Sequence, residues 1–288
     1  MNEFHFPNWV NKFILFLIVA FVVVGGYLAT CIFAAILPSS INVGHRPIQP
    51  VPYSHKLHAG KLKLDCRYCH NTVEQTAGAA IPAIATCGNC HGGNRVKENA
   101  TLNIIFPDSD ALKPIRTSLE TKVPVLWIKV HDLPDFVYFN HSAHINRGVS
   151  CVSCHGRVDK MEVVTQVESL SMKWCLDCHR NPASNIRPVE FVTALDWNPS
   201  PSELDKIYDQ QIEKGFGILD ADGDGQLSYQ DALRFVSRPE ELDADRNQSL
   251  TKDELLVGTR DVDRFSLGRL LMLITGAHPN QNCSTCHR

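Results

Sequence analysis

One long apolar run near the start of the chain predicts its first element. Residues 13–37 (FILFLIVAFVVVGGYLATCIFAAIL) contain no charged side chain. About 25 residues of α-helix extend roughly 37 Å, which is enough to cross a hydrocarbon core of about 30 Å with some tilt. Phe4, Phe6 and Trp9 precede the run, where interfacial aromatic residues are expected, and Pro38 ends it. The pattern therefore predicts a transmembrane helix over 13–37.

Three interpretations of this run stay open. An uncleaved anchor is favoured, because the apolar part of a signal peptide spans only about 7–15 residues. A cleaved signal peptide is the second, and a lipoprotein signal ending at Cys31 is the third, although Thr30 fits that signal poorly. Under the first interpretation, residues 1–12 form a short cytoplasmic N-terminus.

Beyond the run, the chain shows little sustained periodicity as far as about residue 200. Residues 38–202 are rich in proline and glycine, and only 123–130 (VPVLWIKV) favours a strand. The net charge of −3 argues against a nucleic-acid-binding protein, and the 44% hydrophobic content argues against a disordered chain. Composition becomes informative only in its 11 cysteines and 13 histidines.

Ten of the cysteines fall into five Cys-x-x-Cys-His motifs. The motifs are Cys66–Cys69–His70, Cys87–Cys90–His91, Cys151–Cys154–His155, Cys175–Cys178–His179 and Cys283–Cys286–His287. This motif is typical of c-type haem attachment, in which two thiols add to the porphyrin vinyl groups and the histidine binds the iron. Zinc and thiol–disulfide sites also use Cys-x-x-Cys, but they do not need a histidine after every pair. The sequence therefore predicts five haems c.

Covalent haem also predicts the location of the chain. Haem c is attached outside the cytoplasmic membrane in bacteria, so the residues after Pro38 are expected in the periplasm, or outside a cell with one membrane. We therefore expect a single-pass protein of the bacterial inner membrane, with most of its chain in the periplasm.

An internal duplication accompanies the first four motifs. Each copy opens with a histidine box, YSHKLH over 53–58 and FNHSAH over 139–144, and continues with two motifs. The spare histidines are His55, His58, His141 and His144. Residues three apart on a helix project from nearly the same face, whereas the axial ligands of one iron lie on opposite faces of the porphyrin. Each box is therefore expected to bind two different haems.

Four spare histidines satisfy four irons, so the fifth iron needs another ligand. The candidates are Met161, Met172, His131 and His278. A methionine ligand raises the potential relative to two histidines, which would make that haem an electron sink. A methionine is favoured, and the choice between Met161 and Met172 stays open.

A different kind of site lies between the fourth and fifth motifs. Residues 220–231 (DADGDGQLSYQD) match the twelve-residue EF-hand calcium loop, and residues 243–254 (DADRNQSLTKDE) match it with Gln248 in place of glycine. The expected ligands are Asp220, Asp222, Asp224, Gln226 and Asp231 in the first loop, and Asp243, Asp245, Asn247, Ser249 and Glu254 in the second. Asp231 is shorter than the usual glutamate, which weakens binding. One or two structural calcium ions are predicted, and the alternative is an aspartate-rich surface loop.

The predicted fold is thus a multihaem cytochrome c with one N-terminal transmembrane helix. A mostly irregular and α-helical haem domain over 38–202 carries four haems, and an inserted α-helical EF-hand pair occupies 203–260. A C-terminal segment, 261–288, bears the fifth motif and is expected to fold back onto the haem domain.

The motifs and their flanking residues resemble the pentahaem, membrane-anchored cytochrome c subunit of bacterial alternative complex III, a quinol:electron-acceptor oxidoreductase. The resemblance covers about 13–200 and the C-terminal tail. It is carried by the two boxes, by HDLPDFVYF over 131–139, by CRYCH over 66–70, and by LSMKWCLDCHR over 170–180. Residues 203–260 depart from that family's pattern.

The resemblance implies an electron-transfer subunit with no catalytic site of its own. Its partners would be a polytopic quinol-binding subunit, an iron–sulfur protein, other cytochromes and membrane lipid, and its acceptor a soluble cytochrome c or a terminal oxidase. Resemblance to small multihaem cytochromes with the same box implies that His55 pairs with His70 and His141 with His155, which leaves His58 and His144 for other haems.

An enzyme is the main alternative. A multihaem reductase or a stand-alone quinol dehydrogenase would keep one iron open to substrate. Every motif here ends in histidine and the distal ligands fall at most one short, which favours the electron-transfer subunit. A calcium sensor with structural haems is disfavoured, because the acidic loops occupy at most about a fifth of the chain.

Overall fold

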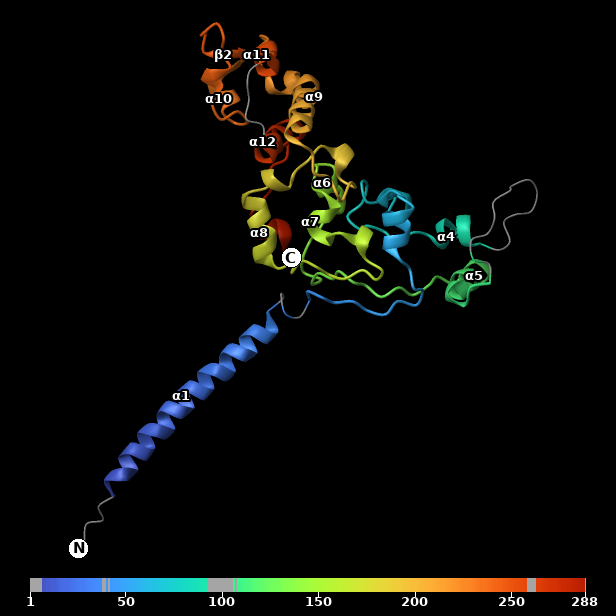
Figure 1. The fold of residues 1–288 in the computed structure, drawn as a ribbon, viewed down its shortest axis with the longest axis vertical. Coiled ribbons are helices and arrows are strands. Elements are labelled where there is room, and N and C mark those ends of the chain that lie inside the picture. The colour runs from blue at the N-terminus through green and yellow to red at the C-terminus, as the bar shows by residue number, and fades with distance from the viewer. Residues whose placement is uncertain are drawn as a thin grey trace.

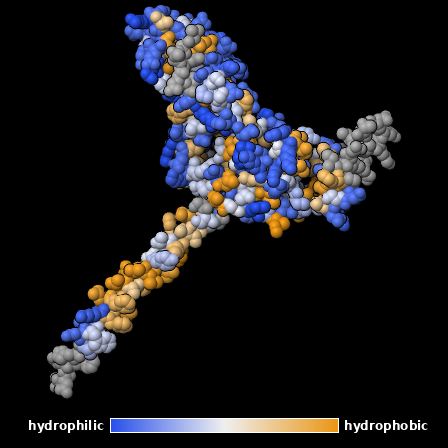
Figure 2. Space-filling view, in the orientation of Figure 1, coloured by the Kyte–Doolittle hydropathy of each residue, from blue (hydrophilic) through white to orange (hydrophobic). Residues whose placement is uncertain are grey.

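The apolar run forms a single long helix. The computed structural model describes residues 7–37, 40, 42–92, 106, 108–257 and 263–287, and its helix α1 spans Asn8–Ile36. This helix buries no side chain and projects from the rest of the molecule as a rod (Figure 1). Its surface is apolar along most of its length (Figure 2). Among the described residues it is the one helix long and apolar enough to cross a membrane.

Residues 42–200, here called the motif-bearing region, consist of short helices joined by irregular chain. The α-helices are α3 (Cys66–Cys69), α4 (Ile84–His91), α5 (Lys113–Thr121), α6 (His141–Ile145), α7 (Cys151–His155) and α8 (Met172–Arg180). A π-helix, η1 (Lys56–Lys61), carries the first box, and four 3-10 turns complete the region: η2 (Asp110–Leu112), η3 (Val158–Lys160), η4 (Ala183–Asn185) and η5 (Val189–Phe191).

Capping residues explain where the motif helices begin. Asp65, Ser150 and Ser171 precede α3, α7 and α8, and each side chain accepts a hydrogen bond from a main-chain amide of the first turn. Each of these three helices therefore begins at or just before a motif. The helix fixes the relative positions of the two cysteines and the histidine of that motif.

The strand predicted over 123–130 does not form. This segment is extended, but a side chain takes the place of a neighbouring strand: Gln49 donates to the carbonyl of Ile128 (2.8 Å) and accepts from its amide (2.9 Å). The Gln49 side chain thus satisfies both main-chain polar groups of Ile128, and no ladder of hydrogen bonds to a second strand forms in this segment.

The two copies of the repeat bind each other through equivalent main-chain positions. The amide of Lys56, next to His55, donates to the carbonyl of Met161 (2.9 Å). The amide of Ser142, next to His141, donates to the carbonyl of Thr76 (3.2 Å). Since Met161 and Thr76 follow the first motif of their copies at the same spacing, each box docks on the loop of the other copy.

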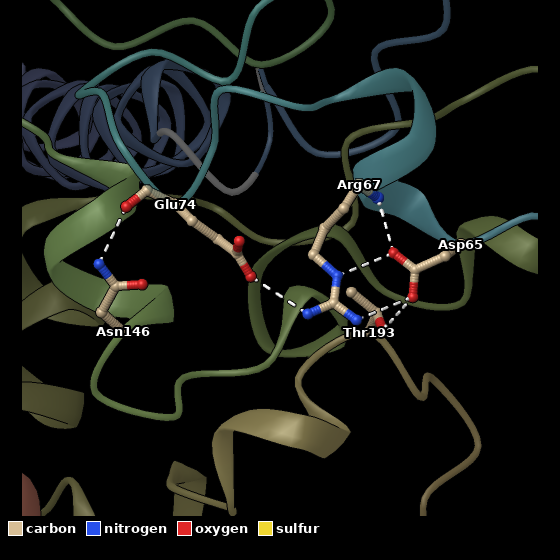
Figure 3. Close-up of polar contacts among 5 residues, drawn as sticks. All are labelled: Asp65, Arg67, Glu74, Asn146 and Thr193. Atoms are coloured by element: carbon tan, nitrogen blue, oxygen red, sulfur yellow. Dashed lines mark hydrogen bonds and ion pairs between the residues drawn. The ribbon is translucent and has the colours of Figure 1, made fainter.

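A cluster of polar side chains also joins the two copies (Figure 3). Arg67 donates to Asp65 (2.9 Å) and to Glu74 (3.1 Å). Thr193 donates to Asp65 (2.8 Å), and Asn146 donates to the carbonyl of Glu74 (2.9 Å). Asn146 and Thr193 belong to the second copy and the segment that follows it, so the cluster spans the boundary between the copies.

Residues 201–277, here called the acidic-loop unit, fold differently. The elements are α9 (Pro201–Leu219), β1 (Gln226–Ser228), α10 (Tyr229–Ala232), η6 (Pro239–Glu241), β2 (Ser249–Thr251), α11 (Lys252–Val257) and α12 (Arg264–Thr275). Strands β1 and β2 pair antiparallel with Leu227 opposite Leu250. Figure 1 shows the unit at the end of the molecule away from α1, and the last helix, α13 (Cys283–Cys286), returns to the motif-bearing region.

The main apolar core lies in the acidic-loop unit. Its buried side chains are Leu204, Tyr208, Ile212, Leu227, Ala232, Phe235, Val236, Leu242, Leu250, Leu255, Leu267, Leu270, Leu271 and Ala277, joined by Ile186. Within the described part of the motif-bearing region, the second such cluster contains only Val73, Ile145 and Val192.

Candidate haem centres and acidic loops

Histidines of the boxes face histidines of the motifs at one recurring separation. The pairs, with the distances between their ring centroids, are His58 and His91 (6.3 Å), His141 and His155 (6.4 Å), and His144 and His179 (6.1 Å). Two imidazoles on opposite sides of one iron have centroids about 6.2 Å apart, since each metal–nitrogen bond is about 2 Å and each centroid lies about 1.1 Å behind its nitrogen. Each pair is therefore spaced to hold one metal ion.

The remaining box histidine, His55, is half-buried near His70. Burial, together with the nearby His70 and His58, lowers the pKa of His55 to about 4. Burial, followed by His131 and His141, lowers the pKa of His155 to about 3. These rings are neutral at neutral pH, which is the form in which an imidazole binds a metal.

The aromatic residue that opens each box contacts both histidines of that box. The ring of Tyr53 lies 4.7 Å from the first histidine of its box, edge-on, and 4.4 Å from the second, stacked. Phe139 repeats this arrangement at 4.7 Å and 4.6 Å. The same geometry in both copies agrees with the expectation that each box binds two haems.

Main-chain carbonyls fix the orientation of five of these rings. The Nδ1 atoms and their partners are His58 with Ser54 (2.9 Å), His70 with Ala80 (2.9 Å), His141 with Ala77 (2.8 Å), His144 with Asn140 (2.7 Å) and His179 with Asn280 (2.7 Å). A carbonyl can only accept, so Nδ1 carries the hydrogen and Nε2 keeps the lone pair that binds a metal. Sequence reasoning missed these acceptors, because any residue can supply a carbonyl.

Thiols of different motifs lie next to one another. A hydrogen bond between Cys66 and Cys151 lowers the pKa of Cys66 and raises the pKa of Cys151. Burial, together with the neighbouring Cys178, raises the pKa of Cys154 to about 12. In the same way, after burial itself, Cys69 raises the pKa of Cys87, and Cys286 raises the pKa of Cys175. Every motif is thus close to at least one other.

The fifth motif packs where the sequence predicts, on the motif-bearing region. The amide of Tyr138 donates to the carbonyl of Cys286 (2.8 Å), and Val137 forms an isolated antiparallel bridge with His287. The ring of Phe136 lies 5.8 Å from that of His287. This motif therefore sits against the segment that leads into the second box.

The four candidates for the last axial position lie in different places. His131 lies 4.4 Å from His155 in the third motif, and its buried Nε2 has no hydrogen-bond partner. Met161 supports the first box through its carbonyl. Met172 is the first residue of α8 and lies one turn before Cys175, whose thiol neighbours Cys286. The Met172 side chain is 65% exposed. His278 is exposed.

Each acidic loop gathers three carboxylates around one point. The carboxylate oxygens of Asp220, Asp222 and Asp224 lie within 4.8 Å of one another, as do those of Asp243, Asp245 and Glu254. Acidic oxygens in such clusters are the ligands that calcium prefers.

The other predicted calcium ligands are arranged less uniformly. Asp231 lies outside the first cluster and accepts from Ser228 (2.7 Å) at the start of α10. In the second loop, Asn247 accepts from the amide of Ser249 (2.8 Å). The hydroxyl of Ser249 donates to the side chain of Gln226, which links the two loops.

Gln248 occupies the position where the calcium loop usually has glycine. It adopts a φ of +67°, and Gly225, its counterpart in the first loop, adopts +82°. A left-handed conformation costs a residue with a side chain roughly 1–2 kcal/mol. The second loop therefore keeps the turn at the expense of some stability.

Known proteins resemble parts of this chain. Residues 137–192 match the family of cytochrome c7 and related cytochrome c, and they contain the second box with the third and fourth motifs. A multihaem cytochrome c subunit of menaquinone reductase from Nitratidesulfovibrio vulgaris is 28% identical over 107 residues, which are 37% of this chain and 45% of that protein. The chain therefore matches less than half the length of that relative. With the histidine geometry, these likenesses identify a mostly helical, cytochrome c7-like multihaem domain whose cofactor is haem c.

Proposed function

We propose that this chain is the electron-transfer subunit of a membrane quinol-oxidising complex of the alternative complex III type, with five covalently bound haems c. The observation that carries the proposal is the set of histidine pairs at 6.1 to 6.4 Å, with Nδ1 atoms anchored to carbonyls. An iron between two such histidines has no open position. It can exchange electrons but cannot bind a substrate, which favours a relay over the reductase alternative.

In this proposal the haems stand in single file. Neighbouring thiols link the second motif to the first, the first to the third, the third to the fourth, and the fourth to the fifth. The two ends of the file are then the second and fifth haems. Electrons would enter at one end and leave at the other, passing through every haem.

For the fifth haem we propose Met172 as the distal ligand to His287. Met172 lies one turn before Cys175, whose thiol neighbours the fifth motif, and its exposed side chain has room to turn toward an iron. Met161 and His131 lie beside boxes and motifs that already have ligand pairs. A methionine would give this haem the highest potential of the five.

The anchor and the relative support a membrane complex. Helix α1 would hold the chain in the inner membrane with its haems in the periplasm, beside a polytopic quinol-binding subunit, an iron–sulfur protein and other cytochromes. The acceptor would be a soluble cytochrome c or a terminal oxidase. Because the relative is named for menaquinone reductase, a second candidate is the reverse flow, in which the haems deliver electrons to a quinone.

We also propose that the acidic loops are a pair of EF-hand calcium sites. Each cluster of three carboxylates, together with the β1–β2 pairing between the loops, supports this assignment. Asp231 lies outside the cluster and accepts a hydrogen bond from Ser228, the N-cap of α10, which makes the first site the weaker one in our proposal. The role of the ions would be structural.

Low-temperature EPR and a pyridine haemochrome assay on the detergent-purified full chain test the relay. We expect five haems per chain, all low-spin. His144→Ala should keep five attached haems but turn one iron high-spin, because His179 would lose its facing ligand. The control His278→Ala changes an exposed histidine and should leave the spectrum unchanged. A low-spin spectrum in His144→Ala would defeat the proposal.

A further inference from the structure

The ring of His179 is held from outside the motif-bearing region. Its Nδ1 donates to the carbonyl of Asn280 (2.7 Å), in the segment that follows α12. Four other rings, within the part of the chain that the structure describes, have carbonyl partners that belong to the motif-bearing region itself. The fourth motif therefore depends on the chain that leaves the acidic-loop unit.

Helix α12 fixes the position of that segment. It packs across η4, the turn that follows α8, and a Cβ on Gly268 would lie only 1.8 Å from the carbonyl oxygen of Ala183. On its other side, Leu267 and Leu270 are fully buried in the core. Gly276, at a φ of +62°, then ends the helix and turns the chain toward Asn280. Asn280 is thus placed by a contact that only glycine permits.

We propose that the acidic-loop unit orients His179 through the Asn280 carbonyl and thereby sets the potential of the fourth haem. This inference rests on the proposed ligation of that haem by His179 and His144. A hydrogen bond from Nδ1 makes the ligating Nε2 more basic, which stabilises ferric iron and lowers the potential. Displacing α12 weakens that bond, so the potential of the fourth haem rises while the other potentials stay unchanged.

The acidic loops connect to the same helix. Leu227 and Leu250, on the paired strands between the loops, are 1% and 0% exposed and belong to the core that contains Leu267 and Leu270. A change in the packing of these strands is therefore transmitted to α12 through side-chain contacts. Calcium removal provides a second way to disturb the same hydrogen bond without changing a residue near the haem.

A spectropotentiometric titration of the full chain, with EPR at each end point, tests the inference. Gly268→Ala forces α12 away from Ala183, and the matched control Gly217→Ala, on α9, introduces a methyl group with nothing within 4 Å. We expect five attached low-spin haems in both variants. In Gly268→Ala, one component should become about tenfold easier to reduce, an upward shift of about 59 mV for a one-electron couple. It should be the component that turns high-spin in His144→Ala.

Two further measurements keep the test decisive. Hydrogen exchange over 264–275 reports whether α12 has moved, and chelation of calcium from the unsubstituted chain replaces Gly268→Ala if that variant does not accumulate. A loosened α12 with five unchanged potentials, or a shift of a different haem, would overturn the inference. A His144→Ala chain that stays low-spin would instead overturn the ligand assignment on which it rests.

Discussion

The motif-bearing region and the acidic-loop unit are built around different interiors. The shorter unit buries a continuous set of leucine, isoleucine and aromatic side chains, whereas the longer region has one small cluster around Val192. Large apolar side chains beside its motifs are instead exposed, among them Leu64 (37%), Tyr68 (48%) and Phe136 (56%). These side chains flank the positions where porphyrins would attach. From this difference we expect that covalent haem would supply the interior of one region, whereas amino acids supply that of the other.

Removing one haem should separate the two regions most clearly. Cys151→Ser combined with Cys154→Ser prevents attachment at the third motif, in the middle of the proposed file. Replacing a buried aromatic ring by alanine costs about 3–5 kcal/mol, and a porphyrin is larger, so the loss approaches the whole stability of a small domain. We expect hydrogen exchange to lose protection over 66–92 and 141–180 while protection over 201–257 stays.

The control for that experiment is Cys31→Ser. Cys31 lies exposed on α1, outside the motifs, so its replacement should leave both exchange patterns and the haem content unchanged. Equal loss of protection in the two regions would contradict separate interiors and indicate one cooperative unit.

Calcium removal should act on the other region with a smaller effect. An ion present at 100 times its dissociation constant stabilises the folded state by about 2.7 kcal/mol. Chelation, or Glu254→Gln in the second cluster, should lower the calorimetric transition of the acidic-loop unit by that order. Asp231→Glu, whose longer side chain reaches toward the first cluster, should raise it.

Asp253→Asn is the matched control for the calcium experiment. Asp253 is exposed and adjacent to Glu254 but lies outside the cluster, so this variant should melt like the parent chain with and without chelator. If Glu254→Gln and Asp253→Asn behaved alike, the second loop would be a surface loop rather than a metal site.

The sequence predicted local elements better than the contacts between them. The apolar run over 13–37 predicted α1, which begins a few residues earlier, and the repeated boxes predicted short helices, which form as η1 and α6. The prediction of a strand over 123–130 was wrong. Gln49, far away in the chain, takes up the hydrogen bonds of the Ile128 main chain that a second strand would otherwise form. Pattern and propensity carry no information about such a distant side chain.

The candidate site divides in the same way. Motif spacing predicted the residues that would attach haem, but the proposed pairing of His58 with His91 and of His144 with His179 depends on distances in space. The hydrogen bond between His179 and the Asn280 carbonyl could not be predicted from the sequence, since every residue has a main-chain carbonyl. The position of Asp231 outside the first cluster could likewise not be predicted from the sequence, because it depends on the hydrogen bond that Asp231 accepts from Ser228.

The smallest predicted effect concerns the polar cluster between the two copies. Hydrogen bonds from Arg67 hold the pKa of Asp65 below its ordinary value of 3.8, and Thr193 adds to the effect. A carboxyl with a depressed pKa stabilises the folded state above its unfolded pKa, and that contribution disappears as the pH falls through the folded pKa. Because Asp65 is 43% exposed, we expect Asp65→Asn to cost less than about 1 kcal/mol at pH 7.

This prediction sharpens the comparison because it is confined to the motif-bearing region. Unfolding followed by the Soret band should differ between Asp65→Asn and the parent chain at pH 7. The difference should shrink only below pH 3.8 and vanish once the pH has fallen through the lowered pKa of the folded carboxyl, where the parent side chain becomes protonated. Asp177→Asn removes a pairing with Lys173 that lies within α8 and should show a smaller difference at either pH. A difference for Asp65→Asn that persisted below the pH at which the folded carboxyl is protonated would mean that the side chain acts through its shape rather than its charge.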